Sequence, residues 1–140
     1  MHVEAVMNNN YTILNGKVVK VSCVFNQDDT FMFNLIIQGD GWQCMYGNFD
    51  VFGDDFDSKE AIKALLSLLE ETNIFNLEGK YVRVAVKHVN SPVEYIGNIV
   101  VDNWYNYLDY YIPVEEYEQF DENRLREILW DSNKVEAVDE

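Results

Sequence analysis

Basic residues are scarce in this chain of 140 residues, which has 10 Lys and Arg against 25 Asp and Glu and a formal net charge of −15. Binding to nucleic acid depends on Lys and Arg side chains that displace counterions from the phosphates. Attraction to an anionic membrane surface depends on the same kind of basic cluster. The composition therefore argues against direct binding to DNA, RNA or anionic lipid, and we expect no nucleic-acid or membrane partner.

Cysteine and histidine are also scarce, with two of each. Cys23 and Cys44 form neither a CxxC motif nor the framework of four or six cysteines typical of secreted domains, so we expect two buried free thiols in a reducing compartment. A single disulfide between neighbouring strands is the alternative. His2 and His88 complete no zinc-ligand spacing with these thiols. Apolar strand surroundings would raise the pKa of either thiol, which disfavours a Cys–His nucleophile.

Long apolar runs and catalytic motifs are missing as well. No window approaches the ~18 apolar residues of a membrane span, and the first residues lack the basic and apolar regions of a signal peptide. There is no G-x-S-x-G, P-loop or G-x-G-x-x-G motif. Loose cation binding by the acidic residues around Asp55 is conceivable, but the calcium-loop pattern fits in neither register. We expect a cytoplasmic binding protein, not an enzyme, with no metal, no cofactor and no catalytic residues.

The apolar residues, 48% of the chain, suffice for a core and follow strand-like patterns over most of it. Residues 17–25 and 30–37 are rich in Val and aromatic residues, and the polar residues 26–29 between them predict a β-hairpin. The Gly39-Asp40-Gly41 turn leads to a third strand over 42–51, with a bulge at Gly47. Two further strands are predicted over 81–89 and 93–101.

A helix is predicted between the third and fourth strands. Asp57 is its expected N-cap, and Glu60 follows at the capping-box spacing. Six apolar residues then recur at helical intervals and would cover one side of the sheet; they are Ala61, Ile62, Leu65, Leu66, Leu68 and Leu69. We expect this helix to end near Glu71. The fold class is therefore α+β: an antiparallel, twisted sheet of about five strands with one amphipathic helix packed on it, and a short C-terminal helix over 121–130.

The negative charge is unevenly distributed, which divides the chain into a core domain at 1–107 and an acidic, aromatic C-terminal extension at 108–140, packed on the core. The extension holds 11 acidic and 3 basic residues among many aromatic ones. Exposed aromatic residues among carboxylates are typical of a protein interface. Alternatively, Trp104, Tyr107 and Tyr111 pack the extension onto the sheet and the acids face solvent. The candidate partner-binding residues are Asp54, Asp55, Trp104, Asp109, Tyr111, Glu115, Glu116, Tyr117, Glu118, Asp121 and Glu122.

Four short motifs carry a resemblance that covers about 90 residues: GKVVKVS at 16–22, GDGW at 39–42, GKYVRV at 79–84 and IGNIVVDNWY at 96–105. Together they resemble a family of small, uncharacterised α+β proteins encoded by bacteriophages and prophages. The chain departs from that pattern at Cys44, Met45 and Asn48, and its acidic extension is longer. The resemblance implies a phage origin and an α+β core, and it brings no catalytic residues.

Phage origin gives the acidity a specific interpretation. Small acidic phage proteins resemble inhibitors of host defence that occupy the cationic groove of a nuclease or CRISPR effector in place of DNA. We therefore expect a phage-encoded binding protein in the host bacterial cytoplasm, with an anti-CRISPR that acts by DNA mimicry as the leading case. Its partner would be a host defence protein with a basic nucleic-acid groove.

Two alternatives stay open. The first is a phage accessory or structural protein that acts through self-association, for instance as a homodimer. The second is a protein that binds a nucleotide signal. That protein would need a basic pocket from the two strands at 17–25 and 81–89, and the candidate residues are Lys17, Lys20, Lys80, Arg83 and Lys87.

Overall fold

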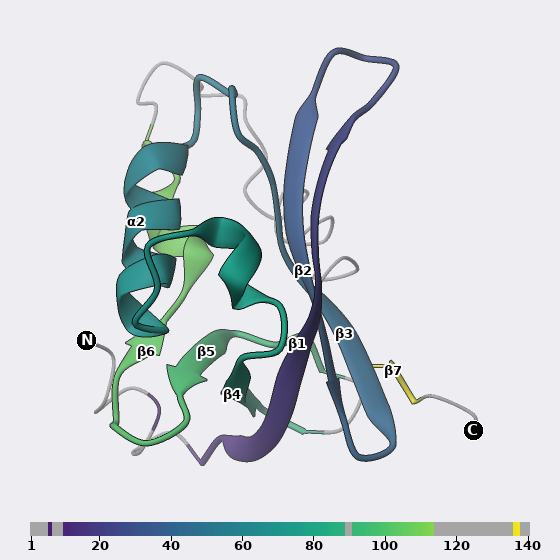
Figure 1. Ribbon diagram of the computed structural model, residues 1–140, viewed down its shortest axis with the longest axis vertical. Coiled ribbons are helices and arrows are strands. Elements are labelled where there is room, and N and C mark those ends of the chain that lie inside the picture. The colour runs from purple at the N-terminus through teal and green to yellow at the C-terminus, as the bar shows by residue number, and fades with distance from the viewer. Residues whose placement is uncertain (1–5, 7–9, 89–90, 114–135, 138–140) are drawn as a thin grey trace.

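The computed structural model describes residues 6, 10–88, 91–113 and 136–137, which form one antiparallel sheet with a helix packed on it (Figure 1). The sheet order is β6-β5-β4-β1-β2-β3-β7. The strands are β1 (Thr12–Phe25), β2 (Phe31–Gly39), β3 (Trp42–Asp50), β4 (Tyr81–Val86), β5 (Tyr95–Asn98), β6 (Trp104–Tyr105) and β7 (Glu136–Ala137). The α+β class is confirmed. The expectation of about five strands was too low, because Trp104–Tyr105 pairs with β5 and a two-residue β7 pairs with β3.

The two predicted hairpins are present. Phe25 lies opposite Phe31 where β1 turns into β2, and Asn26 N donates to Thr30 O at 2.9 Å. Gly41, at φ 76°, makes the β2–β3 turn in a conformation that favours glycine. β1 begins at Thr12 instead of residue 17, because its first half also pairs with β4, from Thr12 opposite Val86 to Lys17 opposite Tyr81.

The bulge predicted in the third strand is confirmed. The β2–β3 register shifts between Phe33, which lies opposite Phe49, and Leu35, which lies opposite Tyr46. Gly47 falls within this shift and has a φ of 80°. The bulge keeps both Tyr46 and Phe49 buried although they are three residues apart.

The helix α2 (Ser58–Leu68) starts where predicted, since the Asp57 side chain accepts a hydrogen bond from Glu60 N at 3.3 Å. It ends at Leu68, earlier than the expected Glu71, because Glu70 has a φ of 58° and reverses the chain. Two 3₁₀ turns, η1 (Ile74–Leu77) and η2 (Tyr107–Tyr110), complete the described helical elements. No helix within the described residues combines the length and the apolar character needed to cross a membrane.

The core has one large part and one small part. The large part lies between the sheet and α2, and it contains the buried residues of α2 together with aromatic side chains such as Phe33, Phe49 and Tyr107. The small part consists of Val6, Ala85 and Trp104. Of the expected extension at 108–140, the structure describes residues 108–113 and 136–137. The helix expected over 121–130 lies outside the described residues.

Both cysteines are free thiols, so no disulfide joins β1 to β3. Cys44 is buried as expected, and burial raises its pKa to about 12. The expectation of a buried Cys23 was wrong. Cys23 lies opposite Phe33, two residues before the end of β1 at Phe25. Partial burial still raises the pKa of Cys23, in the expected direction.

Candidate partner-binding surface

Two acidic segments that are far apart in the sequence meet beside the start of α2. Asp57 N donates to Tyr110 O at 2.8 Å, and Ile112 N donates to Asp55 O at 2.8 Å. An isolated antiparallel bridge pairs Phe56 with Tyr111 between these two bonds. The pairing places the loop before α2 beside η2. We call the resulting set of carboxylates the acidic surface; its members are Asp54, Asp55, Asp57, Glu60 and Asp109.

Phe56 fixes this loop to the core. Its side chain is 4% exposed, and its ring packs against Phe49 at a centroid distance of 4.3 Å and against Tyr111 at 4.7 Å. Because successive side chains of an extended segment point to opposite sides, burying Phe56 turns Asp55 and Asp57 outward, and both are exposed. In this three-residue sequence, Phe56 thus anchors the loop to the core while Asp55 and Asp57 face solvent.

Burial and nearby carboxylates raise the pKa values of Tyr110, at the end of η2, and of Tyr111, which follows it. Burial, and then the charge of Asp55, raises the pKa of Tyr111 to about 12. Burial, and then the charges of Asp109 and Glu60, raises the pKa of Tyr110. Both phenols are therefore neutral at physiological pH and keep their hydroxyl protons. The surface combines fixed negative charges with aromatic rings, as the sequence predicted for this region.

Part of this acidity has a structural role. Asp57 caps α2, and carboxylates in the first turn interact favourably with the helix dipole. Lys59 and Lys63 are also exposed on α2. These two lysines partly offset the negative charge of the acidic surface along the helix.

The structure separates the predicted partner-binding residues into three groups. Asp54, Asp55 and Asp109 are exposed, and Tyr111 is half-buried beside them. Trp104 was wrongly placed in this set, because its side chain is fully buried and it packs the chain onto the sheet, as the alternative interpretation had it. Six further candidates lie outside the described residues: Glu115, Glu116, Tyr117, Glu118, Asp121 and Glu122.

Trp104 is buried by a specific contact across the sheet. It lies opposite Gly97, and a Cβ at Gly97 would lie 2.5 Å from Cζ3 of Trp104. The guanidinium group of Arg83 covers the indole at 4.7 Å from the ring centroid. Glycine is therefore required at 97 for the indole to lie on the strand.

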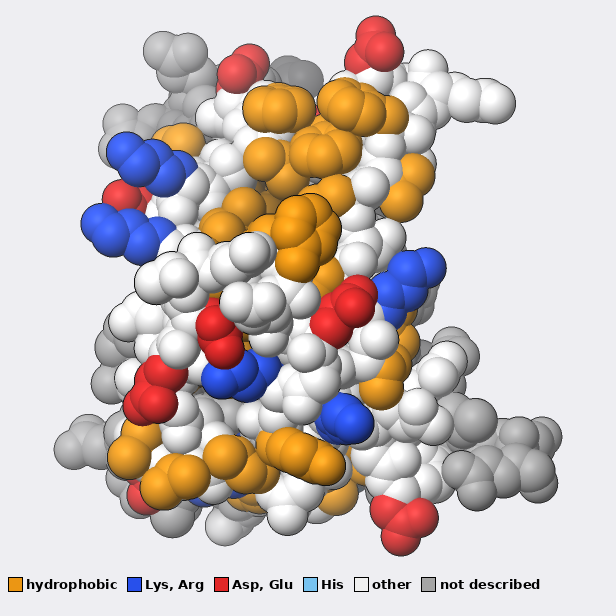
Figure 2. Space-filling model, viewed as in Figure 1, with side chains coloured by type: hydrophobic (Ala, Val, Ile, Leu, Met, Phe, Trp, Pro, Cys, Tyr) orange, Lys and Arg blue, Asp and Glu red, His pale blue; other side chains and the backbone are white. Residues whose placement is uncertain are grey.

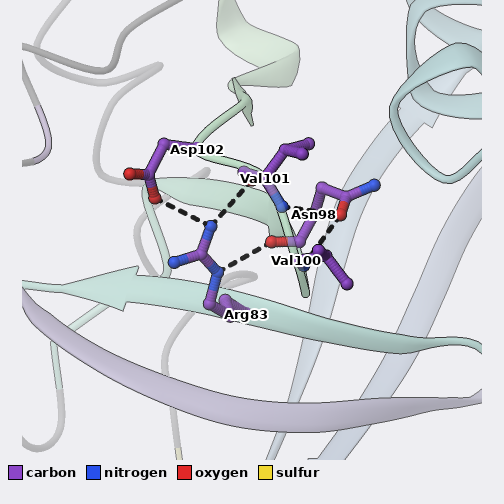
Figure 3. A network of polar contacts seen from close by, with 5 residues as sticks. All are labelled: Arg83, Asn98, Val100, Val101 and Asp102. Atoms are coloured by element: carbon purple, nitrogen blue, oxygen red, sulfur yellow. Dashed lines mark hydrogen bonds and ion pairs between the residues drawn. The ribbon is translucent and has the colours of Figure 1, made fainter.

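Arg83 holds together the loop that joins β5 to β6 (Figure 3). Its Nε donates to Asn98 O at 2.7 Å, and its Nη2 donates to Val101 O at 2.8 Å and to Asp102 Oδ1 at 3.1 Å. The Asn98 side chain accepts hydrogen bonds from the backbone amides of Val100 and Val101. These contacts end β5 at Asn98, so that it is shorter than the strand predicted over 93–101.

The basic residues proposed for a nucleotide pocket are divided among separate contacts. Lys80 pairs with Glu71 at 2.8 Å, while Arg83 is engaged by Asp102 and two carbonyl groups. Lys17 lies over the Tyr81 ring and Lys87 lies over the Tyr11 ring. These four side chains thus make separate contacts within the described residues, and the nucleotide-binding alternative stays a prediction.

Sequence reasoning missed a group of aromatic side chains, two exposed and one half-buried, at the end of the β1–β2 hairpin. The tilted rings of Phe25 and Phe31 pack at a centroid distance of 4.3 Å, and the Phe52 ring stacks on Phe31 at 5.5 Å. Figure 2 shows hydrophobic side chains gathered at this upper end of the molecule, with acidic side chains at the margin. We call Phe25, Phe31 and Phe52 the aromatic tip. The positions of Phe25 and Phe31 on either side of the predicted turn were the available signal.

Two features of the described residues concern metal and nucleophile chemistry. Within them, no group of three or more His, Cys, Asp or Glu side chains could hold a metal ion. Ser91 Oγ lies 2.6 Å from His88 Nδ1, but the two belong to one turn in which Ser91 N donates to His88 O. Ser91 is also fully buried, so a substrate could not reach its hydroxyl.

Comparison with known proteins gives no neighbour. No protein-family model matches the chain, and neither curated proteins nor solved structures show a match. Functional inference therefore depends on the acidic surface, the aromatic tip and the charge of the chain.

Proposed function

We propose that this chain is an acidic binding protein that occupies a basic, nucleic-acid-binding groove on a partner protein. The observation that supports this most directly is the acidic surface, where the 54–60 segment and Asp109 come together on a rigid scaffold. A net charge of −15 attracts the chain toward a cationic groove over several ångströms. Charge complementarity of this kind accelerates association and selects basic partners.

The scaffold suits competition with a nucleic acid. Carboxylates on a helix turn or along an extended loop repeat at roughly 5–7 Å, a spacing comparable with that of phosphates along a strand. A groove that has arranged its Lys and Arg side chains for phosphates can therefore pair with these carboxylates. Because Phe56 anchors the loop, binding requires little additional ordering of its backbone.

The narrower form of the proposal follows from the resemblance to phage-encoded proteins. In that form the chain inhibits a host defence enzyme that handles nucleic acid, and a CRISPR effector that is blocked by DNA mimicry is the leading case. Such an effector holds its nucleic acids in a positively charged channel. The acidic extension beyond residue 113 would add further carboxylates to the contact.

Competition with DNA tests the proposal. Purified CRISPR nucleases with guide RNA would be incubated with the chain, and target DNA binding and cleavage would be measured between about 50 and 500 mM salt. We expect inhibition that DNA overcomes and that weakens steeply with salt. Inhibition that is indifferent to salt, or simultaneous binding of DNA and the chain, would contradict DNA mimicry.

A matched pair of charge reversals tests the location. Asp55→Lys changes the acidic surface, whereas Asp40→Lys makes the same charge change at the exposed β2–β3 turn. We expect Asp55→Lys to weaken inhibition by about tenfold more than Asp40→Lys, since charge pairs at a contact are worth more than distant ones. A further variant that reverses Glu115, Glu116 and Glu118 measures the contribution of the extension. Equal losses for Asp55→Lys and Asp40→Lys would mean that net charge, and not this surface, governs binding.

A further inference from the structure

The aromatic tip is exposed to a degree that its packing role does not require. Phe25 is 67% exposed and Phe52 is 68% exposed, while Phe31 lies half-buried between them. The three rings pack against one another, and Phe31 precedes Phe33 of the buried Phe33–Phe49 pair by two residues on β2. Isolated exposed apolar residues are ordinary on protein surfaces, but a contiguous aromatic group commonly marks an interaction site.

The backbone holds these rings in place. Val51 N donates to Phe31 O at 2.8 Å, and one oxygen of Asp50, Oδ1, accepts from Phe31 N at 3.0 Å and from Phe52 N at 3.2 Å. The hairpin end and the loop after β3 are thus tied to each other through Asp50. A partner would meet aromatic rings that are already arranged, which lowers the entropy cost of binding.

Carboxylates surround the aromatic tip without any neighbouring cation in the sequence. No Lys or Arg occurs between Lys20 and Lys59, and this stretch contains all three residues of the tip. It also contains seven aspartates. Six of them lie in the hairpin turn next to the tip, at the end of β3 or in the loop that carries Phe52: Asp28, Asp29, Asp50, Asp54, Asp55 and Asp57. The seventh, Asp40, lies in the β2–β3 turn at the other end of the hairpin. The tip is therefore an apolar centre with an acidic margin.

We propose that the aromatic tip is the apolar anchor through which the chain docks onto a protein surface that offers an apolar pocket bordered by Lys and Arg. Charge complementarity selects this occupant. A second copy would bring the same aspartates face to face, which is unfavourable, and an anionic membrane would repel them. This inference rests on the proposed function, because it assigns the apolar contact to the same class of basic partner.

A set of short synthetic peptides serves as the probe. The Arg/Leu peptide alternates Arg with Leu. The Arg/Ser peptide has Ser in place of every Leu, and the Glu/Leu peptide has Glu in place of every Arg. Fluorescence anisotropy would measure their affinities for the full chain and for three variants: Phe25→Ser, Phe52→Ser and Tyr81→Ser. Tyr81 is a matched control, because it is an aromatic residue that is 63% exposed on β4 and pairs with Lys17, away from the hairpin end.

We expect the Arg/Leu peptide to bind most tightly and to lose about 10- to 100-fold in affinity with Phe52→Ser, the range typical of an aromatic hot spot. Tyr81→Ser should stay within about twofold of the natural chain. Phe25→Ser should repeat the effect of Phe52→Ser, and circular dichroism would confirm that both variants fold. Chemical-shift changes on adding the peptide should centre on the amides of Phe25, Phe31 and Phe52.

Each other outcome has a definite meaning. If the Phe variants bind the Arg/Leu peptide as tightly as the natural chain, or if the Glu/Leu peptide binds equally well, the proposal is overturned. Concentration-dependent dimerisation that Phe52→Ser abolishes would identify a second copy as the occupant and would also overturn it. The Arg/Ser peptide separates the two proposals: if it does not bind at low salt, the acidic surface fails as a cation-binding site, whatever the aromatic tip does.

Discussion

Replacing Arg83 by Met would test whether this residue is a structural clamp or part of a basic binding pocket. Met keeps much of the aliphatic stem and removes the guanidinium group, so the carbonyl oxygens of Asn98 and Val101 lose their bonds to Arg83. The ring of Trp104 also loses its cationic cover. Stability should fall, and any small-molecule binding that depended on Arg83 would fall with it.

The magnitude follows from the exposure of each contact. A charge-assisted bond to a partly buried carbonyl is worth about 1.5 kcal/mol, and the more exposed bond to Val101 contributes roughly half of that. Cation–π contact with a buried indole adds about 1 kcal/mol. The pair with Asp102, whose side chain is 52% exposed, adds only a few tenths of a kcal/mol. Allowing for non-additivity, we expect a loss of about 2–3 kcal/mol.

Urea unfolding followed by circular dichroism would measure this loss. Lys17→Met is the matched control, because it removes a single exposed cation–π contact at 5.6 Å and should cost less than about 0.5 kcal/mol. The reasoning would be refuted if Arg83→Met cost no more than Lys17→Met. It would also be refuted if a nucleotide stabilised the natural chain but not Arg83→Met, since Arg83 would then be a ligand for anions.

Three further predictions concern packing, pH and thiol chemistry. Gly97→Ala should destabilise the fold by about 2 kcal/mol or more in urea unfolding, because the added Cβ would overlap the Trp104 ring. Gly53→Ala is the control and should cost less, because the nearest atom to its added Cβ, at 3.1 Å, belongs to the flexible side chain of Asp55. The pKa of Tyr111 is raised from 10.0 to about 12 in the folded chain. Its contribution to the free energy of unfolding is therefore complete below pH 10 and is lost as pH rises toward 12. Tyr111→Phe should reduce the decline in the free energy of unfolding between pH 9.5 and pH 11.5 by up to about 2 kcal/mol. A thiol reagent should label exposed Cys23 in the native chain and buried Cys44 only after unfolding, as peptide mass mapping would show.

Local sequence signals predicted most of the scaffold because each carries its own physical cause. The Asp57 cap of α2 is a local interaction that does not depend on how the helix packs. The bulge at Gly47 follows from a backbone conformation that residues other than glycine rarely adopt. The early end of α2 was not predicted, because it depends on a φ of 58° at Glu70, which is uncommon for a residue other than glycine. The short β5 could not be predicted, because Arg83 ends it through tertiary contacts. Trp104 was wrongly predicted to lie at the partner-binding surface for the same reason. Its burial depends on Gly97 of the neighbouring strand, and that contact cannot be predicted from the hydrophobic pattern of the sequence.

The candidate site was predictable in its chemistry and not in its geometry. Composition indicated acids among aromatic residues, and Asp54, Asp55 and Asp109 are indeed exposed. Their approach depends on the Phe56–Tyr111 bridge between segments more than fifty residues apart. The aromatic tip was missed because Phe25 and Phe31 read as ordinary strand residues. Their strand pattern does not show that Phe25 is exposed and Phe31 only half-buried.

The loop between β3 and α2 carries both features, since Phe52 belongs to the aromatic tip and Asp55 to the acidic surface. If the two form one contact, their contributions to binding should be coupled. A double-mutant cycle with Phe52→Ser and Asp55→Lys against the Arg/Leu peptide would measure this; neighbouring residues that share a partner typically show about 0.5–3 kcal/mol of coupling. Strict additivity would instead indicate two independent sites. Coupling would explain how an acidic chain selects among basic proteins, because charge attracts all of them and the rings fit only those with an apolar pocket.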